Sequence, residues 1–440
     1  MKKRIIARKL TLRKITLKRI MKKRITSRII SLIVCAALLA GMLALTGCGL
    51  FRKPVPTTYP YVFVHGLNGF GDDSRIPASY WGATAGALLP ELEKEGFPRC
   101  YAPSVGAMGS AWDNACELYA QLMGGTVDYG AAHSAAHSHE RFGAEYAQPL
   151  FPGWGEKDED GNLVKANLIA HSFGGATARV LAGLLADGSQ AEREAAPEDC
   201  SPLFAGGKGD WIFSVTALAS PHNGVSILAI VDINPGLSQL AGLLGSSAEI
   251  LESVLGQFGV SSDIGSLEHI LQSAKTMDTA YYDLSIPGAE KVNEALRPYK
   301  DSYYFSYPID GTKDGLTGRV ADTGDMTAKL RLPARLIGAN TIKGKTAGSI
   351  TFDDSWLPND GLVNTISATA PFNEAHVDFD ASALLSPADY EPGTWYVMPT
   401  VRGDHGTIIG LGRAMNETLP LYLEQLRRID ELSLYVTGKR

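Results

Sequence analysis

The sequence predicts an α/β fold, in which a mostly parallel central sheet is flanked by helices. Tyr61–Val64 is a short apolar run rich in β-forming residues, and apolar residues at helical spacing follow it between Trp81 and Leu92. The same order recurs at Asn167–Leu181, where an apolar run precedes an alanine-rich helical pattern. Trp211–Ser220 is a further buried-strand pattern. Short apolar strands that alternate with helices are typical of parallel sheets, whose strands are buried on both faces.

The remaining elements follow the same alternation. We expect a helix over Ala111–Gly125 and a closing helix over Glu417–Val436, since both carry apolar residues at helical spacing. Further strands are predicted at three apolar runs, which are Ser302–Pro308, Ala334–Asn340 and Thr394–Thr400. Residues 225–273 form an apolar, sparsely charged insert between strands, which is either an ordinary pair of core helices or a mobile cap over the site.

Length and charge restrict the class of protein. The chain has 440 residues and is 45% hydrophobic, so it can bury a large core. We find no second domain boundary and assign residues 59–440 to one domain. Thirteen of the 41 Lys and Arg residues lie in Met1–Arg28, whereas all 47 acidic residues follow Cys48. The body is therefore strongly acidic, which argues against a nucleic-acid partner.

The N-terminus has the pattern of an export signal. The basic Met1–Arg28 precedes an uncharged apolar run that ends in Leu45-Thr46-Gly47-Cys48. The ending resembles the lipobox of bacterial lipoproteins, so residues 1–47 are expected to be a signal peptide and Cys48 the lipidated first residue of the mature protein. Residues 48–58 would then be a tether, and the protein a cell-surface lipoprotein bound to the membrane. A retained membrane anchor and plain secretion are the alternatives.

The three cysteines of the body are too widely spaced to define a disulfide framework. Cys100, Cys116 and Cys200 are expected to be small buried hydrophobic residues, although the sequence allows one bridge with one spare thiol.

Ser172 is either a nucleophile or a helix cap. It lies in Ala170-His171-Ser172-Phe173-Gly174, between a predicted strand and a predicted helix. A nucleophile elbow has this context and needs small residues two positions to either side of the serine, which Ala170 and Gly174 supply. Serine is also a favoured N-cap residue, so the pentapeptide alone does not decide.

A nucleophilic serine requires a base and an acid that orients the base. In the α/β-hydrolase fold these follow in the order Ser, Asp or Glu, His. His405 is the histidine that combines a late position with a loop after a strand, and Asp360 heads an Asp-Gly turn that can aim a carboxylate. The backbone N–H groups of Leu67 and Phe173 are the expected oxyanion donors. The other candidates considered are His222, His269, His376, Asp353 and Asp354.

Several segments together resemble the secreted bacterial true lipases of the thermophilic bacillus and staphylococcal group. They occur in the family's order between Tyr61 and the C-terminus, and the stretch from Asp113 to Gly143 is the most specific. The segments are HGLNGFG, YWG, WDNACELYAQLMGGTVDYGAAHSAAHSHERFG, AHSFGG, SPLF, DTAYYDLSIPGAEKVN and WLPNDGLVNTIS. The resemblance implies an α/β-hydrolase fold with a helical lid, which would correspond here to residues 225–273, and a zinc-binding extra region.

The resemblance also implies residue roles. Ser172 would be the nucleophile, Asp360 the acid and His405 the base, while Leu67 and Phe173 stand at the family's oxyanion positions. Asp113, His133 and His139 match three of the family's four zinc ligands. The segment that best matches the fourth has Gly256 where an aspartate is expected, which leaves Glu252, Asp263, His137 or water as substitutes. Thr407 and Gly412 replace the acids that bind calcium in the family, so no calcium is expected there.

The sequence thus predicts an exported, lipid-anchored lipase that hydrolyses carboxyl esters of lipids, with triacylglycerols as the expected substrates, through an acyl-enzyme on Ser172. A carboxylesterase or phospholipase with the same triad is the nearest alternative. An inactive surface lipoprotein that uses the zinc-stapled fold for binding is the alternative from another class. The sequence does not determine the oligomeric state.

Overall fold

A computed structural model describes residues 59–72, 74, 76–233, 277–380 and 386–438. Residues 1–54 form a separate unit from residues 55–440, and the description below concerns the second unit. The described residues do not include the predicted signal and tether or most of the predicted lid. Four lid residues named above also lie outside them, which are Glu252, Gly256, Asp263 and His269. Among the described helices, none is both long and apolar enough to cross a membrane.

The centre of the fold is a seven-stranded parallel sheet with the strand order β13-β14-β7-β6-β5-β1-β2. The predicted α/β architecture is therefore confirmed. The strands are β1 (Tyr61–Val64), β2 (Cys100–Tyr101), β5 (Ala166–His171), β6 (Ile212–Leu218), β7 (Tyr303–Tyr307), β13 (His376–Asp378) and β14 (Trp395–Val397). Four small two-stranded sheets surround it, made of β3 (Gly125–Asp128) with β4 (Phe142–Tyr146), β8 (Ile309–Asp310) with β15 (Val401–Arg402), β9 (Thr312–Gly315) with β10 (Gly318–Ala321), and β11 (Thr346–Ala347) with β12 (Ile350–Thr351).

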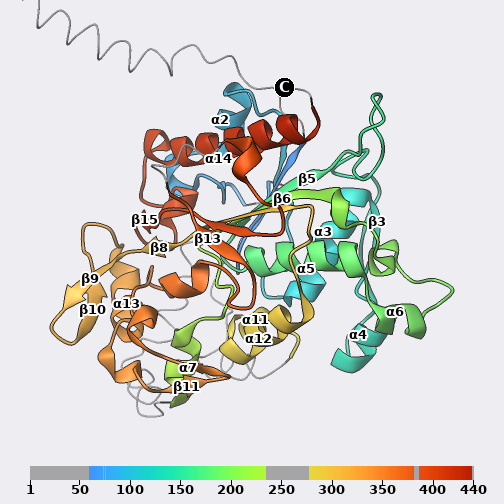
Figure 1. The fold of residues 1–440 in the computed structure, drawn as a ribbon. Helices are drawn as coiled ribbons and strands as arrows, with labels where there is room; N and C mark the ends of the chain where they lie inside the picture. Colours follow the sequence, from blue (N-terminus) through green and yellow to red (C-terminus); the bar gives the residue numbers. More distant parts are fainter. Residues whose placement is uncertain (1–58, 73, 75, 234–276, 381–385, 439–440) are drawn as a thin grey trace, which may run out of the picture. The chain divides into compact units, whose positions relative to one another are not determined.

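Helices cover both faces of the central sheet (Figure 1). The helices α2 (Leu88–Lys94) and α14 (Met415–Val436) lie on one face, and α3 (Ala111–Met123) and α5 (Gly174–Asp187) on the other. Side chains of β1 alternate between two cores: Tyr61 and Phe63 pack with α2 and α14, whereas Val62 and Val64 pack with α3 and α5. This alternation is the period of two that a strand imposes, and it explains why the whole of β1 is apolar.

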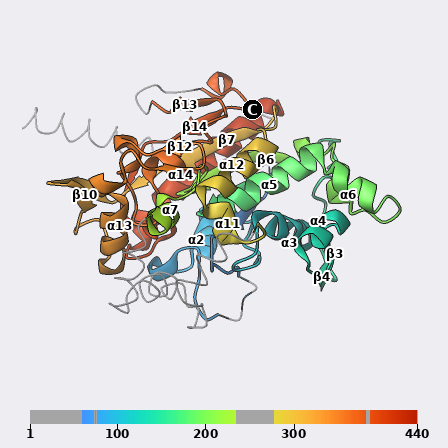
Figure 2. The ribbon, with the colours of Figure 1, turned by 90° about the horizontal axis from the view of Figure 1, so that it is seen from below.

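Figure 2, turned by 90° from Figure 1, shows the remaining helices. They are α4 (Ala131–His137), α6 (Gln190–Ala195), α7 (Ser226–Ile233), α11 (Ala280–Leu284), α12 (Ile286–Ala295) and α13 (Arg331–Ile337). Of these, α12 lies beside α5. α7 begins the predicted lid insert, whose remaining residues lie outside the described part of the chain.

The strand predicted at Ala334–Asn340 is wrong, because most of this run belongs to α13. Leu330, Ala334 and Ile337 are all buried, and their spacing is that of one face of a helix. The three described cysteines are free: Cys116 is buried as expected, while Cys100 and Cys200 are only partly buried.

Candidate active site and metal centre

Ser172 stands at the turn between β5 and α5. Its φ is 55°, which is uncommon for a residue other than glycine, and its N–H donates to Leu218 O at 2.9 Å. A Cβ on Gly174 would collide with the backbone carbonyls of Val64 and His65, so a residue without a side chain is needed at that position. Phe173, not Ser172, is the N-cap of α5, and no side chain caps this helix. The helix-cap interpretation of Ser172 is therefore wrong.

The structure brings Ser172, His405 and Asp360 together. His405 Nε2 lies 2.8 Å from Ser172 Oγ, and His405 Nδ1 lies 2.7 Å from Asp360 Oδ2. Both the imidazole and the carboxylate are almost completely buried, with exposed fractions of 4% and 1%. Because a carboxylate only accepts hydrogen bonds, Nδ1 carries the proton and Nε2 is left to accept the serine hydroxyl proton. This arrangement can activate a serine for attack on an acyl carbonyl.

Backbone groups fix the orientation of both partners of the serine. Asp360 Oδ1 accepts the N–H groups of Leu362 at 2.9 Å and Val363 at 2.7 Å, so its other oxygen is left for His405. The N–H of His405 donates to the carbonyl of Asp360 at 2.9 Å. The backbone of the Asp-Gly turn therefore fixes the orientation of the carboxylate.

The other candidate side chains lie elsewhere. His222 is buried against Trp395, with ring centroids 4.6 Å apart, and His376 is exposed on β13. Burial, with a smaller contribution from Arg179, holds the pKa of His222 well below its usual value. Asp353 accepts the N–H of Ser355, and Asp354 forms an ion pair with Lys343.

The two expected oxyanion donors lie at the edge of the serine turn. Within the described residues, the N–H groups of Leu67 and Phe173 have no protein acceptor. Gly66, next to Leu67, approaches Ser172 so closely that a Cβ there would lie 2.7 Å from Ser172 Cβ. The end of β1 is thus near enough to the serine to contribute a backbone donor.

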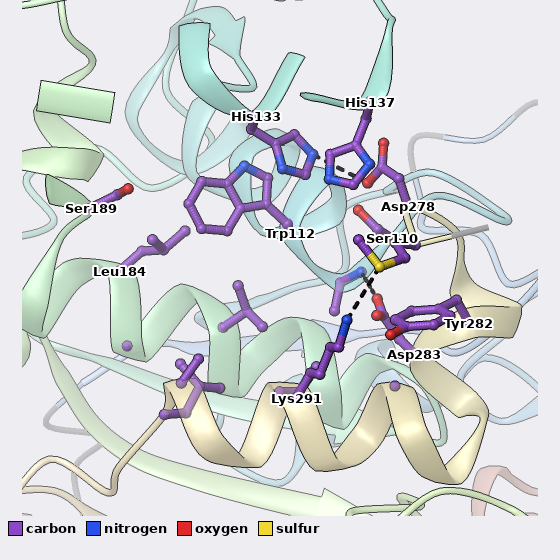
Figure 3. Close-up of a pocket in the computed structure, with 18 of the residues that line it drawn as sticks. Ser110, Trp112, His133, His137, Leu184, Ser189, Asp278, Tyr282, Asp283 and Lys291 are labelled. Atoms are coloured by element: carbon purple, nitrogen blue, oxygen red, sulfur yellow. Dashed lines mark hydrogen bonds and ion pairs between the residues drawn. The ribbon is translucent and has the colours of Figure 1, made fainter. Parts of the chain in front are cut away.

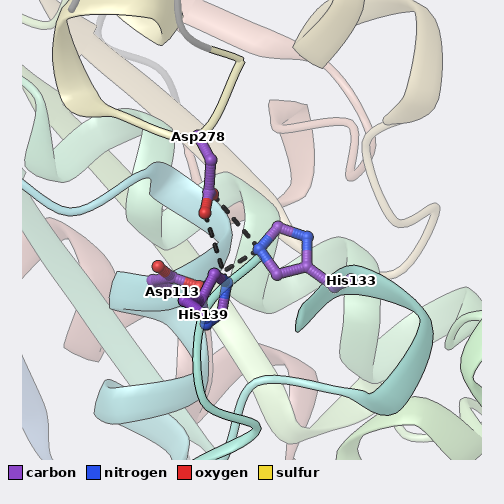
Figure 4. Close-up of side chains that lie close together, drawn as sticks. All are labelled: Asp113, His133, His139 and Asp278. Carbon is purple, nitrogen blue, oxygen red and sulfur yellow. Dashed lines mark ion pairs between the residues drawn. The ribbon is translucent and has the colours of Figure 1, made fainter. Parts of the chain in front are cut away.

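A second group of polar side chains could hold a metal ion. Asp113 of α3, His133 of α4, His139 and Asp278 each offer one ligand atom, and all four atoms lie within 4.8 Å of one another (Figure 4). His133 Nε2 is 3.2 Å from an oxygen of Asp113 and 3.2 Å from one of Asp278, and His139 Nε2 is 3.3 Å from the other oxygen of Asp278.

The donor atoms of this cluster fit a cation. Each of the four residues has a buried ligand atom with no hydrogen-bond partner, although buried polar atoms normally have one. The atoms converge on one another instead of on protein donors, and a metal ion at their centre would satisfy all four.

Asp278 was not among the ligands predicted from sequence. The family's fourth ligand was sought near Gly256, but Asp278 occupies the fourth position of the cluster. His137, another suggested substitute, packs against His133 with ring centroids 4.6 Å apart and the rings tilted by 45°, and it is not part of the group. The available signal was that Asp278 opens the family-like stretch DTAYYDLSIPG.

Residues around the cluster hold its ligands in place. Glu192 of α6 accepts the N–H groups of Ala132 and His133, each at 2.8 Å, and thereby caps the first turn of α4. Trp112 stacks between His133 and Phe204, with ring centroids 5.0 and 5.6 Å away.

A cavity of about 310 Å³ opens beside the metal cluster (Figure 3). Its walls come mainly from α5 and α12, and His133 and Asp278 reach it, but none of Ser172, Asp360 and His405 lines it. Lys291 points across it and approaches Met277 Sδ at 3.2 Å. The cavity is therefore separate from the serine site.

The positions expected to have lost calcium ligands make protein hydrogen bonds. Thr407 Oγ1 donates to Asp404 Oδ1 at 3.1 Å, and Gly412 N donates to Thr84 Oγ1 at 2.7 Å. Arg413 lies 3.9 Å from Glu417. The absence of calcium from this location stays a prediction.

Comparisons with known proteins agree with this geometry. The chain is 34% identical over 369 residues to a lipase of Staphylococcus hyicus, an alignment that covers 80% of this chain and 53% of the relative. The chain thus spans about half the length of the curated relatives it matches. Among solved structures, lipase 1 of Pelosinus fermentans is 34% identical with a TM-score of 0.68, covering 86% of this chain and 99% of that one. EstA of Clostridium botulinum is 32% identical with a TM-score of 0.69, covering 87% and 90%.

The family assignment rests on most of the chain. A family model described as the lipase-like C-terminal domain matches residues 57–419, a range that contains the serine site and the metal cluster. Together with the parallel sheet, this match shows that the chain belongs to the family of lipase-like C-terminal domains with an α/β-hydrolase fold.

Proposed function

We propose that this protein is a serine hydrolase that cleaves carboxyl esters of lipids, with triacylglycerols as the expected substrates. The observation that carries the proposal is the hydrogen-bonded series Ser172, His405 and Asp360, with distances of 2.8 and 2.7 Å, at a strained turn between strand and helix. Lipases among the relatives support the substrate class.

The reaction follows from the positions of the protons. His405 Nε2 removes the proton of Ser172 while Oγ attacks the ester carbonyl, and the carbonyl oxygen becomes an anion that Leu67 and Phe173 N–H groups stabilise. The proton then passes from His405 to the leaving alcohol as the ester C–O bond breaks, which leaves an acyl group on Ser172. Water, deprotonated by His405, attacks this acyl-enzyme; the bond between Ser172 Oγ and the acyl carbon then breaks, His405 returns the proton to Oγ, and a carboxylic acid leaves. Asp360 stabilises the imidazolium in both halves.

A hydrolysis assay with a Ser172→Ala variant tests the proposal. The body from Tyr59 onward should hydrolyse emulsified tributyrin, and the variant should lose on the order of 10⁶-fold in kcat, as removal of a triad nucleophile does. Hydrolysis of soluble p-nitrophenyl esters alone would favour a carboxylesterase. A folded wild-type protein that neither cleaves esters nor reacts with a serine-directed phosphonate would favour an inactive binding protein.

We further propose that the metal is zinc, held by Asp113, His133, His139 and Asp278. Histidine nitrogens and aspartate oxygens both bind zinc, and ligands about 2.0–2.1 Å from a tetrahedral zinc ion lie roughly 3.3 Å apart. The closest ligand-atom separations are 3.2–3.3 Å. A bound zinc would join α3, α4 and the segment before α11 and would have a structural role. Metal analysis of the purified protein should give one zinc per chain, and Asp278→Ala should abolish it.

Export and lipidation at Cys48 complete the proposal, and they rest on the sequence of residues 1–48. Metabolic labelling with a fatty acid should mark the wild-type chain and not a Cys48→Ser variant. Release of unlabelled protein into the medium would favour plain secretion.

A further inference from the structure

Tyr80 and His171 form a buried hydrogen-bonded chain beside the triad. Tyr80 Oη lies 2.6 Å from His171 Nδ1 and accepts the N–H of Gly66 at 2.9 Å. His171 Nε2 lies 3.1 Å from the backbone carbonyl oxygen of His405. Tyr80 and His171 are 3% and 1% exposed, so water does not replace these contacts.

The backbone carbonyl of His405 determines which atoms carry the protons in this hydrogen-bonded series. A carbonyl oxygen only accepts, so His171 Nε2 carries a proton and donates it to His405 O. Burial, and next the nearby His405, hold the pKa of His171 well below its usual value, so the ring is neutral and Nδ1 is unprotonated. The Tyr80 hydroxyl consequently donates to Nδ1, while its oxygen accepts from Gly66.

The hydrogen bonds of Tyr80 and His171 connect the three segments that carry the proposed catalytic groups. Gly66 precedes the oxyanion residue Leu67, His171 precedes the nucleophile Ser172, and the third contact is to the backbone of His405 itself. We propose that Tyr80 and His171 are positioning residues that hold the oxyanion loop, the serine turn and the catalytic histidine in register. This inference rests on the proposed function.

Hydrogen bonds hold both the backbone N–H and the backbone carbonyl of His405, the proposed base. The N–H of His405 donates to Asp360 O at 2.9 Å and its carbonyl accepts from His171, so the peptide groups on either side of the imidazole are anchored. The rings of His171 and His405 are 4.8 Å apart, and a neutral His171 adds no like charge when His405 becomes an imidazolium. Tyr80 and Trp81 pack on His171 from a third segment, and neither carries a charge.

Removal of the Tyr80 hydroxyl tests the inference, with a matched control. Tyr80→Phe leaves His171 Nδ1 and Gly66 N without their partner and should lower kcat for soluble p-nitrophenyl butyrate by about 10–100-fold with KM little changed, since small displacements of reacting groups cost that much. Tyr304 is also buried, and its hydroxyl accepts the N–H of Tyr299 at 2.7 Å, away from the triad. Tyr304→Phe should lower the thermal midpoint comparably and leave kcat of the folded enzyme unchanged.

Two substitutions of His171 supply an independent readout. His171→Gln keeps an N–H that can donate to His405 O, whereas His171→Leu removes it, so the Gln variant should retain at least tenfold more kcat than the Leu variant. Equal kcat for the two, or a Tyr80→Phe variant that matches Tyr304→Phe, would overturn the inference and leave the proposed function intact. A folded wild-type enzyme without esterase activity overturns both.

Discussion

At the level of single residues, Asp360 is the member of the proposed triad whose role is least evident from sequence. The Asp-Gly turn favours Asp360 as the acid, but Asp353 and Asp354 are only a few residues away. The structure explains the difference, since the carboxylate of Asp360 accepts two backbone N–H groups and one imidazole N–H, whereas Asp353 and Asp354 interact at the surface.

Asp360→Asn should therefore leave the fold nearly intact but reduce kcat on the order of 10⁴-fold. The amide can present its NH₂ to His405 Nδ1, which favours the tautomer that carries its proton on Nε2, the wrong nitrogen for a base. Ester hydrolysis at pH 8 with matched circular dichroism spectra measures this loss. Asp354→Asn, which lies on the same segment and pairs with Lys343, is the control and should keep wild-type kcat. A loss of less than tenfold in Asp360→Asn would contradict the assigned role.

At the level of elements, the sequence was informative where local pattern and tertiary environment agree. β1, β5 and β6 are buried on both faces, and their continuous apolar runs predict that. The prediction of a strand at α13 is wrong because a short apolar run does not show whether its residues repeat at helical or strand spacing. The helix is distinguished from a strand by the buried face that Ala334 and Ile337 form with Leu330. Asp278 could not be identified by spacing alone, since it is far in sequence from Asp113 and the connection between them includes the central strands β5 and β6.

The short helix α4 depends on a neighbouring element for its position. Its first turn is capped by Glu192 of α6, which is 2% exposed, and not by a side chain of its own. Because His133 lies in that turn, Glu192→Ala should weaken zinc binding by about 10–100-fold, as loss of outer-shell support typically does.

A chelator competition with a chromophoric zinc dye measures this affinity, with ester hydrolysis as a separate readout. Glu194→Ala is the matched control, because Glu194 is on the same helix, is exposed and accepts a hydrogen bond from Gln190 Nε2 at 2.6 Å. Equal zinc affinities of the two variants would show that α4 is positioned without the cap.

At the level of the whole molecule, the fold buries histidines that the unfolded chain exposes. His171 contacts the Tyr80 hydroxyl, the backbone carbonyl of His405 and the His405 ring, and is buried. His222 is buried against the Trp395 ring, and its Nε2 has no hydrogen-bond partner among the described residues. The sequence could place these residues near strand ends, since His171 ends one apolar run and His222 follows another. It could not show that they are neutral, because that depends on burial by segments distant in the chain.

This burial predicts how stability changes with pH. For His171 and His222 the folded pKa is lowered mainly by burial, whereas the unfolded value is about 6.5. Above that pH both states are neutral, so the full stability is present. Below it the unfolded chain takes up protons that the folded protein excludes, so the free energy of unfolding falls as pH decreases, by up to about 1.4 kcal/mol per pH unit for each histidine.

Urea denaturation between pH 7.5 and 5 can isolate one of these histidines. The slope of the unfolding free energy against pH below 6.5 should be smaller in His222→Gln than in the wild type, by the equivalent of about one bound proton. His376→Gln, at an exposed position of β13, should keep the wild-type slope. The metal cluster is the same in all three proteins, so its own pH dependence cancels in the comparison. If His222→Gln and the wild type lost stability in parallel below pH 6.5, His222 would have to accept its proton inside the folded protein, and its burial next to Arg179 would not keep it neutral.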